Sequence, residues 1–125
     1  MTDAAIRYQR IAELLLEEIE TIIPLEMNDP RVVNTRVTRV RLAQDMKTCL
    51  IYVVVDGSET EKVEAMAALE HARSYIRGQI STVLNMKFTP KFDFAYDFDR
   101  EKADGVEKTL AALRVEEDPD APASE

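Results

Sequence analysis

Few side chains in this sequence could carry out covalent chemistry. The single histidine, His71, lies in a stretch with helical apolar periodicity, and the single cysteine, Cys49, lies in an apolar run. A nucleophile needs a base within hydrogen-bonding reach, and these two residues are far apart in the sequence, so we interpret both as structural. Asp93, Asp97 and Asp99 could offer oxygen ligands to a divalent cation, although the polar face of a half-buried strand explains the same spacing better. The sequence therefore predicts a protein that is not an enzyme and needs no cofactor or metal.

Basic residues are the other group with a clear chemistry, because arginine and lysine neutralise phosphate groups. They outnumber acidic residues between positions 28 and 58, and again between positions 70 and 91. Arginines on a strand can also serve only to keep it soluble, so the phosphate interpretation requires a fold that brings both sets to one side. The candidate phosphate-binding residues are Arg31, Arg36, Arg39, Arg41, Arg73, Arg77, Lys87 and Lys91.

The elements that must position these residues begin with a helix and a strand in the second half of the chain. Between residues 66 and 84, apolar residues recur mostly every three or four positions, which predicts an amphipathic helix. Asn85 is a suitable end for it, because asparagine tolerates a left-handed backbone. From Phe88 to Phe98 the even positions are aromatic or proline, which predicts a strand with one buried face. Proline lacks a backbone donor, so Pro90 lies at the start of this strand or at a sheet edge.

The first half of the chain is predicted to hold one helix and two strands. The threonine and aspartate at positions 2–3 can cap a first helix, and Pro24 ends or kinks it. An arginine-rich strand follows at positions 33–42. In it, Val37 and Val40 are three apart, which breaks strict alternation and predicts a β-bulge or a twist between them.

The next strand and the remaining helices are read from apolar runs and capping residues. Residues 49–55 are apolar at odd and even positions alike, which is typical of a central strand or one covered on both faces. Ser58 or Thr60 can cap the helix that follows. A last helix of two to three turns is outlined by Val106, Leu110 and Leu113.

Length and composition indicate one small domain followed by a tail. A chain of 125 residues can bury a core without disulfides or metal, although its net charge of −8 does not favour a nucleic-acid partner. Residues 115–125 carry five acidic residues and no apolar stripe, so we predict a domain at 1–114 and a disordered acidic tail at 115–125. The lone cysteine, the short apolar runs and the absence of an export pattern lead us to expect a cytoplasmic protein with no membrane partner.

The predicted order of elements fits two architectures. One is a ferredoxin-like variant lacking a strand, and the other is the type II arrangement of KH domains, which hold single-stranded nucleic acid against a helix pair. A set of short motifs, in this order, separates them: Arg7-x-x-Arg10-Ile11, Asp29-Pro30-Arg31-Val32, Val37-Thr38-x-Val40, Tyr52-Val53, Ala72-x-x-Tyr75-Ile76-Arg77 and Pro90-x-Phe92-x-Phe94. Over roughly residues 6–114, this ordered set resembles the ribosome-binding factor A family.

The resemblance implies both a fold and a function. The fold would be α+β and KH-like type II, namely α-β-β-α-kink-α-β, with a short C-terminal helix. The function would be that of a monomeric ribosome biogenesis factor that binds the small (30S) ribosomal subunit and 16S rRNA near its 5′ end during late maturation and rRNA processing, without catalysis and with no small-molecule substrate. The alternative is a protein-binding adaptor of ferredoxin-like or KH-like fold with no RNA role.

One segment departs from the family pattern. Members of the family usually break the second helix with Ala-x-Gly, whereas the aligned residues here are Ala72, Arg73 and Ser74. Ser74 can donate a hydrogen bond to the Glu70 carbonyl, which bends a helix without requiring positive φ. We therefore predict a shallow bend at or beside Ser74, and we include Ala72 and Ser74 among the candidate RNA-binding residues.

Overall fold

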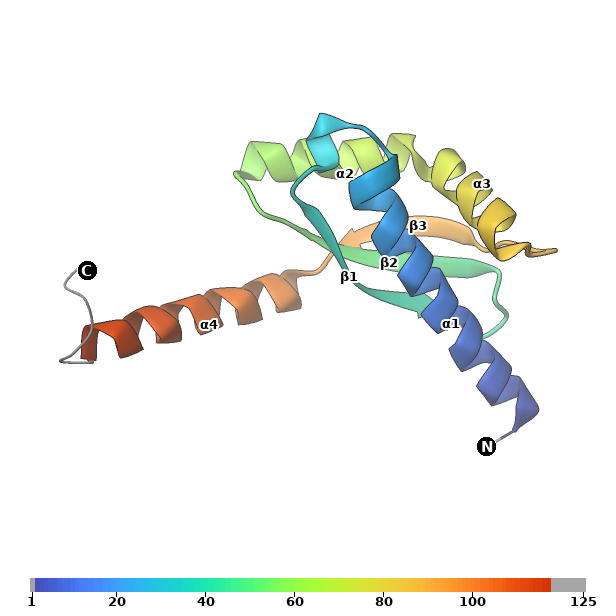
Figure 1. Cartoon of the computed structure of the whole chain (residues 1–125), viewed down its shortest axis with the longest axis horizontal. Helices are drawn as coiled ribbons and strands as arrows, with labels where there is room; N and C mark the ends of the chain where they lie inside the picture. The colour runs from blue at the N-terminus through green and yellow to red at the C-terminus, as the bar shows by residue number, and fades with distance from the viewer. Residues whose placement is uncertain (1, 118–125) are drawn as a thin grey trace.

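The computed structural model describes residues 2–117, and their arrangement confirms the predicted KH-like type II fold (Figure 1). Within this range no helix combines the length and the apolar character that crossing a bilayer requires. In chain order the elements are helix α1 (Asp3–Thr21), the π-helical turn η1 (Ile22–Glu26), the 3-10 turn η2 (Pro30–Val32), strands β1 (Thr35–Leu42) and β2 (Thr48–Val55), helices α2 (Glu59–His71) and α3 (Arg73–Leu84), strand β3 (Lys91–Tyr96) and helix α4 (Phe98–Glu117).

The three strands form one sheet in the order β1-β2-β3, with β1 antiparallel and β3 parallel to β2. The apolar run is therefore the central strand, as predicted. The pairing of β1 with β2 shifts between Val37 and Arg39, which confirms the predicted bulge. Arg36 pairs with Val54 and Arg39 with Tyr52. Because side chains alternate between faces and these two partners are two residues apart, the bulge puts both arginines on the same face of the sheet.

The hydrophobic core lies between one face of the sheet and the helices α1, α2 and α3. Burying these apolar side chains is the main force that holds helices and sheet together. Figure 1 shows α1 crossing the sheet, with α2 and α3 following each other beside β3. The fully buried core side chains include Leu15, Ile19, Ile51, Val53, Leu69, Ile76, Ile80 and Phe92.

The opposite face of the sheet, called the open face below, is polar and partly exposed. It carries the exposed arginines of β1, the half-buried Leu50 and Tyr52 of β2, and the exposed Lys91 and Asp93 of β3. This alternation of apolar and polar faces is what a sheet covered on one side requires.

The helix predicted as one bent element is two helices, α2 and α3, with Ala72 between them. Ala72 has φ −88° and ψ 1°, its N–H donates to the carbonyls of Ala68 and Glu70, and its own carbonyl accepts the N–H of Ile76. The break therefore lies two residues before Ser74, which is a helical residue of α3. The described side chains form no hydrogen bond from Ser74 to Glu70, so the predicted mechanism of the bend is wrong: the backbone of Ala72 makes it.

Capping residues set most of the other helix ends where the sequence places them. The Thr2 hydroxyl accepts the N–H of Ala5 at 3.2 Å. Ser58 forms a reciprocal capping box with Glu61 at the start of α2. Asn85 ends α3 with a left-handed φ of 51°. The regular α1 ends at Thr21, and Pro24 lies in the η1 turn that follows, because proline cannot support the α-helical hydrogen bond.

The strand β3 is shorter than the aromatic alternation predicts. It starts at Lys91, whose N–H donates to the Lys47 carbonyl at 2.9 Å, directly after the donor-less Pro90. Phe88 therefore precedes the strand and is 80% exposed, and Phe98 follows it in the first turn of α4 and is 72% exposed. The expectation that both rings lie on the buried face is wrong.

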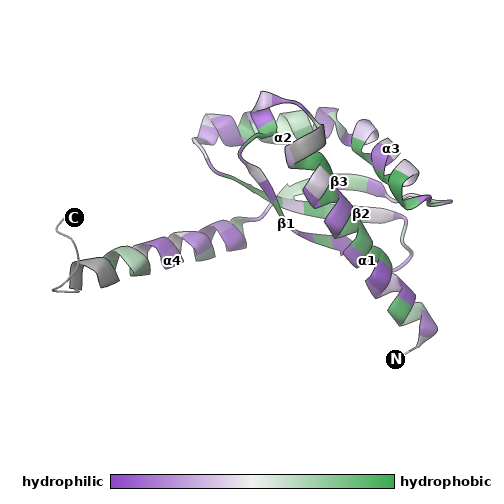
Figure 2. Cartoon of the chain, viewed as in Figure 1, coloured by the Kyte–Doolittle hydropathy of each residue, from purple (hydrophilic) through white to green (hydrophobic). Residues whose placement is uncertain are grey.

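The helix α4 is longer than the two or three turns predicted. Asp97 caps it, since its carboxylate accepts the N–H of Arg100 at 3.0 Å and its carbonyl accepts that of Glu101. Figure 2 shows that hydrophilic residues dominate the half of α4 nearer the sheet, so an apolar stripe could not reveal those turns. Residues 115–117 belong to α4. The rest of the predicted tail, 118–125, lies outside the described residues.

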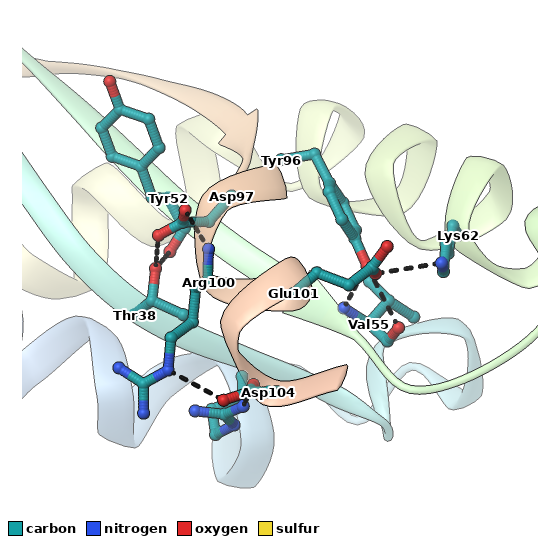
Figure 3. Close-up of polar contacts among 10 residues, drawn as sticks. Thr38, Tyr52, Val55, Lys62, Tyr96, Asp97, Arg100, Glu101 and Asp104 are labelled. Carbon is teal, nitrogen blue, oxygen red and sulfur yellow. Dashed lines mark hydrogen bonds and ion pairs between the residues drawn. The ribbon is translucent and has the colours of Figure 1, made fainter. Parts of the chain in front are cut away.

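Polar contacts hold the start of α4 against the sheet and α2 (Figure 3). The Thr38 hydroxyl donates to the Asp97 carboxylate at 2.6 Å, and this bond is the main reason why the pKa of Asp97 is lowered. Glu101 accepts a hydrogen bond from the Tyr96 hydroxyl and pairs with Lys62 at 2.9 Å. In Figure 1, α4 points away from the rest of the domain.

Candidate nucleic-acid interface

A groove of about 1250 Å³ lies between α1, α3, the β1–β2 turn and the segment that leads into β3. We call it the basic groove, because its lining includes Arg7, Lys47, Arg77, Lys87 and Lys91. Within residues 2–117, the only acidic side chain in its lining is Asp45, whose carboxylate accepts the N–H of Lys47 at 3.0 Å. A chain with a net charge of −8 thus concentrates positive charge in one groove.

Apolar side chains complete the groove. Its lining includes Ile11, Leu14, Leu84, Met86 and the exposed Phe88. The ammonium nitrogen of Lys87 lies 5.5 Å from the centroid of the Phe88 ring. Cations that can bind phosphates therefore stand beside an exposed ring on which a nucleobase could stack.

Two arginines of α3 connect this helix to the β3 side of the groove. Arg77 donates two hydrogen bonds to the Thr89 carbonyl oxygen, from Nε at 3.2 Å and from Nη2 at 2.8 Å. Arg73 pairs with Asp93 at 2.7 Å and with Glu70 at 3.4 Å. Arg73, Ser74, Arg77 and Lys91 also line a smaller recess that continues the groove along β3. Both arginines are thus exposed, but each already binds an oxygen atom of this chain.

The other predicted candidates lie elsewhere. On the open face, Arg36 pairs with Asp104 of α4 at 2.9 Å, and Arg39 pairs with Asp97 at 3.4 Å. Arg31 pairs with Asp29 at 2.8 Å in the η2 turn. Ala72 forms the helix break and lies outside the groove lining. The candidate residues are therefore divided among the groove, the open face and the η2 turn, and do not share one side.

Among the basic and aromatic residues of the groove lining, three are not candidates named from the sequence: Arg7, Lys47 and Phe88. Arg7 belongs to a motif that carries the family resemblance, and Lys47 lies at the polar turn between two strands. Alternation alone assigns Phe88 to the buried face of a strand. The adjacent Lys87 and the nearby Pro90 indicate an exposed connector instead.

The residues considered for covalent or metal chemistry lie apart. Cys49 is buried in the core, which raises the pKa of its thiol to about 11. His71 is the exposed last residue of α2. Asp93 faces Arg73, while Asp97 is turned toward Thr38. In residues 2–117 no group of three or more histidine, cysteine or acidic residues is arranged to hold a metal ion.

Fold and groove together define the class: a KH-like type II domain with a basic groove beside its broken helix pair. The sequence model of one family, ribosome-binding factor A, matches residues 7–110. This chain belongs to the ribosome-binding factor A family.

Individual relatives are similar to this chain, in sequence or in structure, over most of its length. Ribosome-binding factor A of Dictyoglomus thermophilum is 35% identical over 116 residues, which cover 92% of this chain and 97% of the relative. The crystal structure of ribosome-binding factor A from Thermus thermophilus superposes with a TM-score of 0.55 at 25% identity, covering 74% of this chain and 92% of that one. Coordinates of the Thermus thermophilus protein fitted into a cryo-EM map of a 30S complex superpose with a TM-score of 0.52 at 25% identity, covering 70% and 88%.

Proposed function

We propose that this protein binds the small (30S) ribosomal subunit, and 16S rRNA near its 5′ end, during late subunit maturation and rRNA processing. It acts in the cytoplasm as a monomer and catalyses no reaction. Membership of the ribosome-binding factor A family supports the ribosomal partner. A relative of the same fold, the Thermus thermophilus protein, has been fitted into a map of a complex with the 30S subunit.

The basic groove is the observation that carries this proposal. Five cationic residues from four separate parts of the chain line one groove and leave Asp45 as its only acid. Phosphate neutralisation supplies much of the affinity of proteins for RNA, and exposed aromatic rings such as Phe88 add base stacking.

A salt titration and a pair of lysine variants test the proposal. If three to five rRNA phosphates are neutralised, affinity for purified 30S subunits falls roughly 20- to 130-fold between 50 and 200 mM salt. Replacing Lys47 and Lys87 together by alanine removes two groove cations. We expect weaker binding and a salt slope that is shallower by about 0.7 for each phosphate that these lysines neutralise.

The matched control carries the same change of charge outside the groove. Lys102 and Lys108 lie on α4, which contributes no residue to the groove lining, so Lys102→Ala with Lys108→Ala should bind 30S subunits as the unchanged protein does. Equal losses in both double variants would indicate a general charge effect and count against the groove. Absence of binding to 30S subunits and their precursors would overturn the proposed function as a whole.

A protein-binding adaptor is the second candidate, and one feature of α4 favours it. Val106, Leu110 and Leu113 lie on one stripe of this helix and are each about half exposed. A protein that covered this stripe would bind through apolar contacts with little dependence on salt. Salt-independent association with the subunit, unaffected by the groove variants, would therefore favour the adaptor.

A further inference from the structure

The open face of the sheet also carries basic residues, and its β1 arginines lie outside the basic groove. The β-bulge between Val37 and Arg39 brings Arg36, Arg39 and Arg41 to this face, where a regular strand would have turned Arg36 the other way. Arg41 and Arg39 pair across the strands with Leu50 and Tyr52 of β2. Basic, apolar and aromatic side chains therefore share one face of the sheet.

Arg39 and Tyr52 form a stacked pair at the centre of this surface. The guanidinium carbon of Arg39 lies 3.9 Å from the centroid of the Tyr52 ring. Its Nε also donates to the Asp97 carboxylate at 3.4 Å. Figure 3 shows the Thr38 hydroxyl bound to the same carboxylate. The Arg39 side chain is still 54% exposed. Its guanidinium is thus held between a ring and a carboxylate while much of it stays open to solvent.

Such a pair has the chemistry to receive an unpaired nucleobase. Bases of single-stranded RNA stack on aromatic rings and on arginine guanidinium planes, and this stacking tolerates any base. The carboxylates around the surface already have cationic partners: Asp93 pairs with Arg73, Asp97 with Arg39, and Asp104 with Arg36 and Arg100. Arg41 is exposed and, among the described side chains, has no ion pair within 4 Å, so it is free for a phosphate.

We propose that the open face is a second RNA-binding surface, which stacks an unpaired base on the Arg39–Tyr52 pair and contacts the adjacent phosphate with Arg41. It rests on the proposed function, because it takes the same class of ligand. The β1 arginines and Tyr52 of the open face do not line the groove, although Lys91 of β3 borders both surfaces, so one domain contacts two segments of RNA. Because most charges on this face are paired, its binding depends on salt less than that of the groove.

The test uses the full chain and a fluorescently labelled 12-nucleotide oligo(A) RNA. Tyr52→Phe keeps the ring, whereas Tyr52→Val keeps a strand-forming residue and removes the ring. Arg39→Lys keeps the charge and removes the guanidinium plane. Added to the groove variant Lys47→Ala with Lys87→Ala, Tyr52→Phe should leave oligo(A) binding unchanged, and Tyr52→Val and Arg39→Lys should each weaken it at least about 5-fold. Circular dichroism and melting temperature verify that each variant is folded.

The groove variant Lys47→Ala with Lys87→Ala separates the two proposals. Oligo(A) that still binds this variant, and no longer binds once Tyr52→Val is added, places a second site on the open face. Unchanged oligo(A) binding when Tyr52→Val or Arg39→Lys is added to this groove variant would overturn the second site and leave the groove proposal standing. Photocrosslinking of 4-thiouridine RNA gives an independent result: adducts on the peptide with Tyr52 support the second site, and adducts confined to groove peptides refute it. If a protein rather than RNA bound this face, Tyr52→Val and Arg39→Lys would lose binding to that protein while oligo(A) binding stayed unchanged, which would overturn the second RNA site.

Discussion

The guanidinium of Arg77 donates both of its hydrogen bonds to one atom, the carbonyl oxygen of Thr89, at 3.2 and 2.8 Å. This contact ties α3 to the segment that carries Lys87 and Phe88 along the basic groove. Arg77 therefore positions other groove residues in addition to lending its own charge.

Replacing Arg77 separates these two contributions. Arg77→Ala removes both hydrogen bonds and should lower the free energy of unfolding by about 1 kcal/mol, measured by urea denaturation. Arg77→Lys keeps the charge but lacks the planar fork that reaches the carbonyl twice. We expect Arg77→Lys to bind 30S subunits nearly as weakly as Arg77→Ala. Full binding by Arg77→Lys would show that only the charge matters.

Asp97 gives a pH-dependent contribution to stability. Its carboxylate accepts the Thr38 hydroxyl and the Arg100 N–H and pairs with Arg39, and these contacts lower its pKa. A carboxyl whose pKa is lower in the folded chain stabilises the fold fully above its unfolded pKa of about 3.9, and this contribution is lost as the pH falls through the folded pKa. Replacement by asparagine, which can still cap a helix, removes the charge and replaces one of the two acceptor oxygens by a donor.

The two substitutions of Asp97 should therefore differ. Asp97→Ala loses the cap as well as the charge and should cost about 0.5–2 kcal/mol from the cap alone at pH 7. The difference in unfolding free energy between the unchanged chain and Asp97→Asn should shrink as the pH drops below about 4. Denaturant titrations from pH 7 to pH 3 measure this, and a difference that grows toward acid would contradict the assigned pKa direction.

Cys49 should be almost unreactive in the folded protein. It is 1% exposed, and burial raises its thiol pKa to about 11, so little thiolate exists at pH 8. Ellman's reagent should label the native chain at least roughly 100-fold more slowly than the chain in guanidinium chloride. Since the sequence holds no other cysteine, the unfolded chain is its own control. Rapid native labelling would mean that β2 opens readily.

The elements that the sequence predicted well are those whose cause is local. The capping box of Ser58 and the left-handed Asn85 lie within a few residues of the ends they set, and the irregular spacing of Val37 and Val40 is itself the mark of the bulge. The first turns of α4 carry no apolar stripe, and part of their support is not local: Glu101 pairs with Lys62 of α2, and Asp97 accepts a hydrogen bond from Thr38 of β1. The spacing of apolar residues in the sequence does not indicate such contacts.

The site was only partly predictable for the same reason. Arg77, Lys87 and Lys91 lie close in sequence, and the groove unites them. Arg7 and Lys47 join them through tertiary packing alone, and Arg36, Arg39 and Arg41 lie on the other face of the sheet although their charge looks the same in the sequence. Counting charges in the sequence identifies the basic residues, but only the three-dimensional fold shows which of them lie close together.

Ser74 stands where the sequence resemblance leads us to expect a glycine, and the backbone at this position does not need one. The break between α2 and α3 lies at Ala72, with a negative φ of −88°, and among the described residues other than glycine only Asn28, Met46 and Asn85 have positive φ. Ser74 is helical and exposed. A glycine there gains no permitted conformation and adds backbone freedom to the unfolded chain.

Ser74→Gly should therefore lower the free energy of unfolding by some tenths to about 1 kcal/mol. The matched control is Asn85→Gly, because Asn85 has a φ of 51°, where glycine carries no steric cost, so this variant should be neutral or slightly more stable. Urea denaturation of both variants, side by side, gives the comparison. If Ser74→Gly instead stabilised the chain as much as Asn85→Gly, the helix pair in solution would break at Ser74 with positive φ.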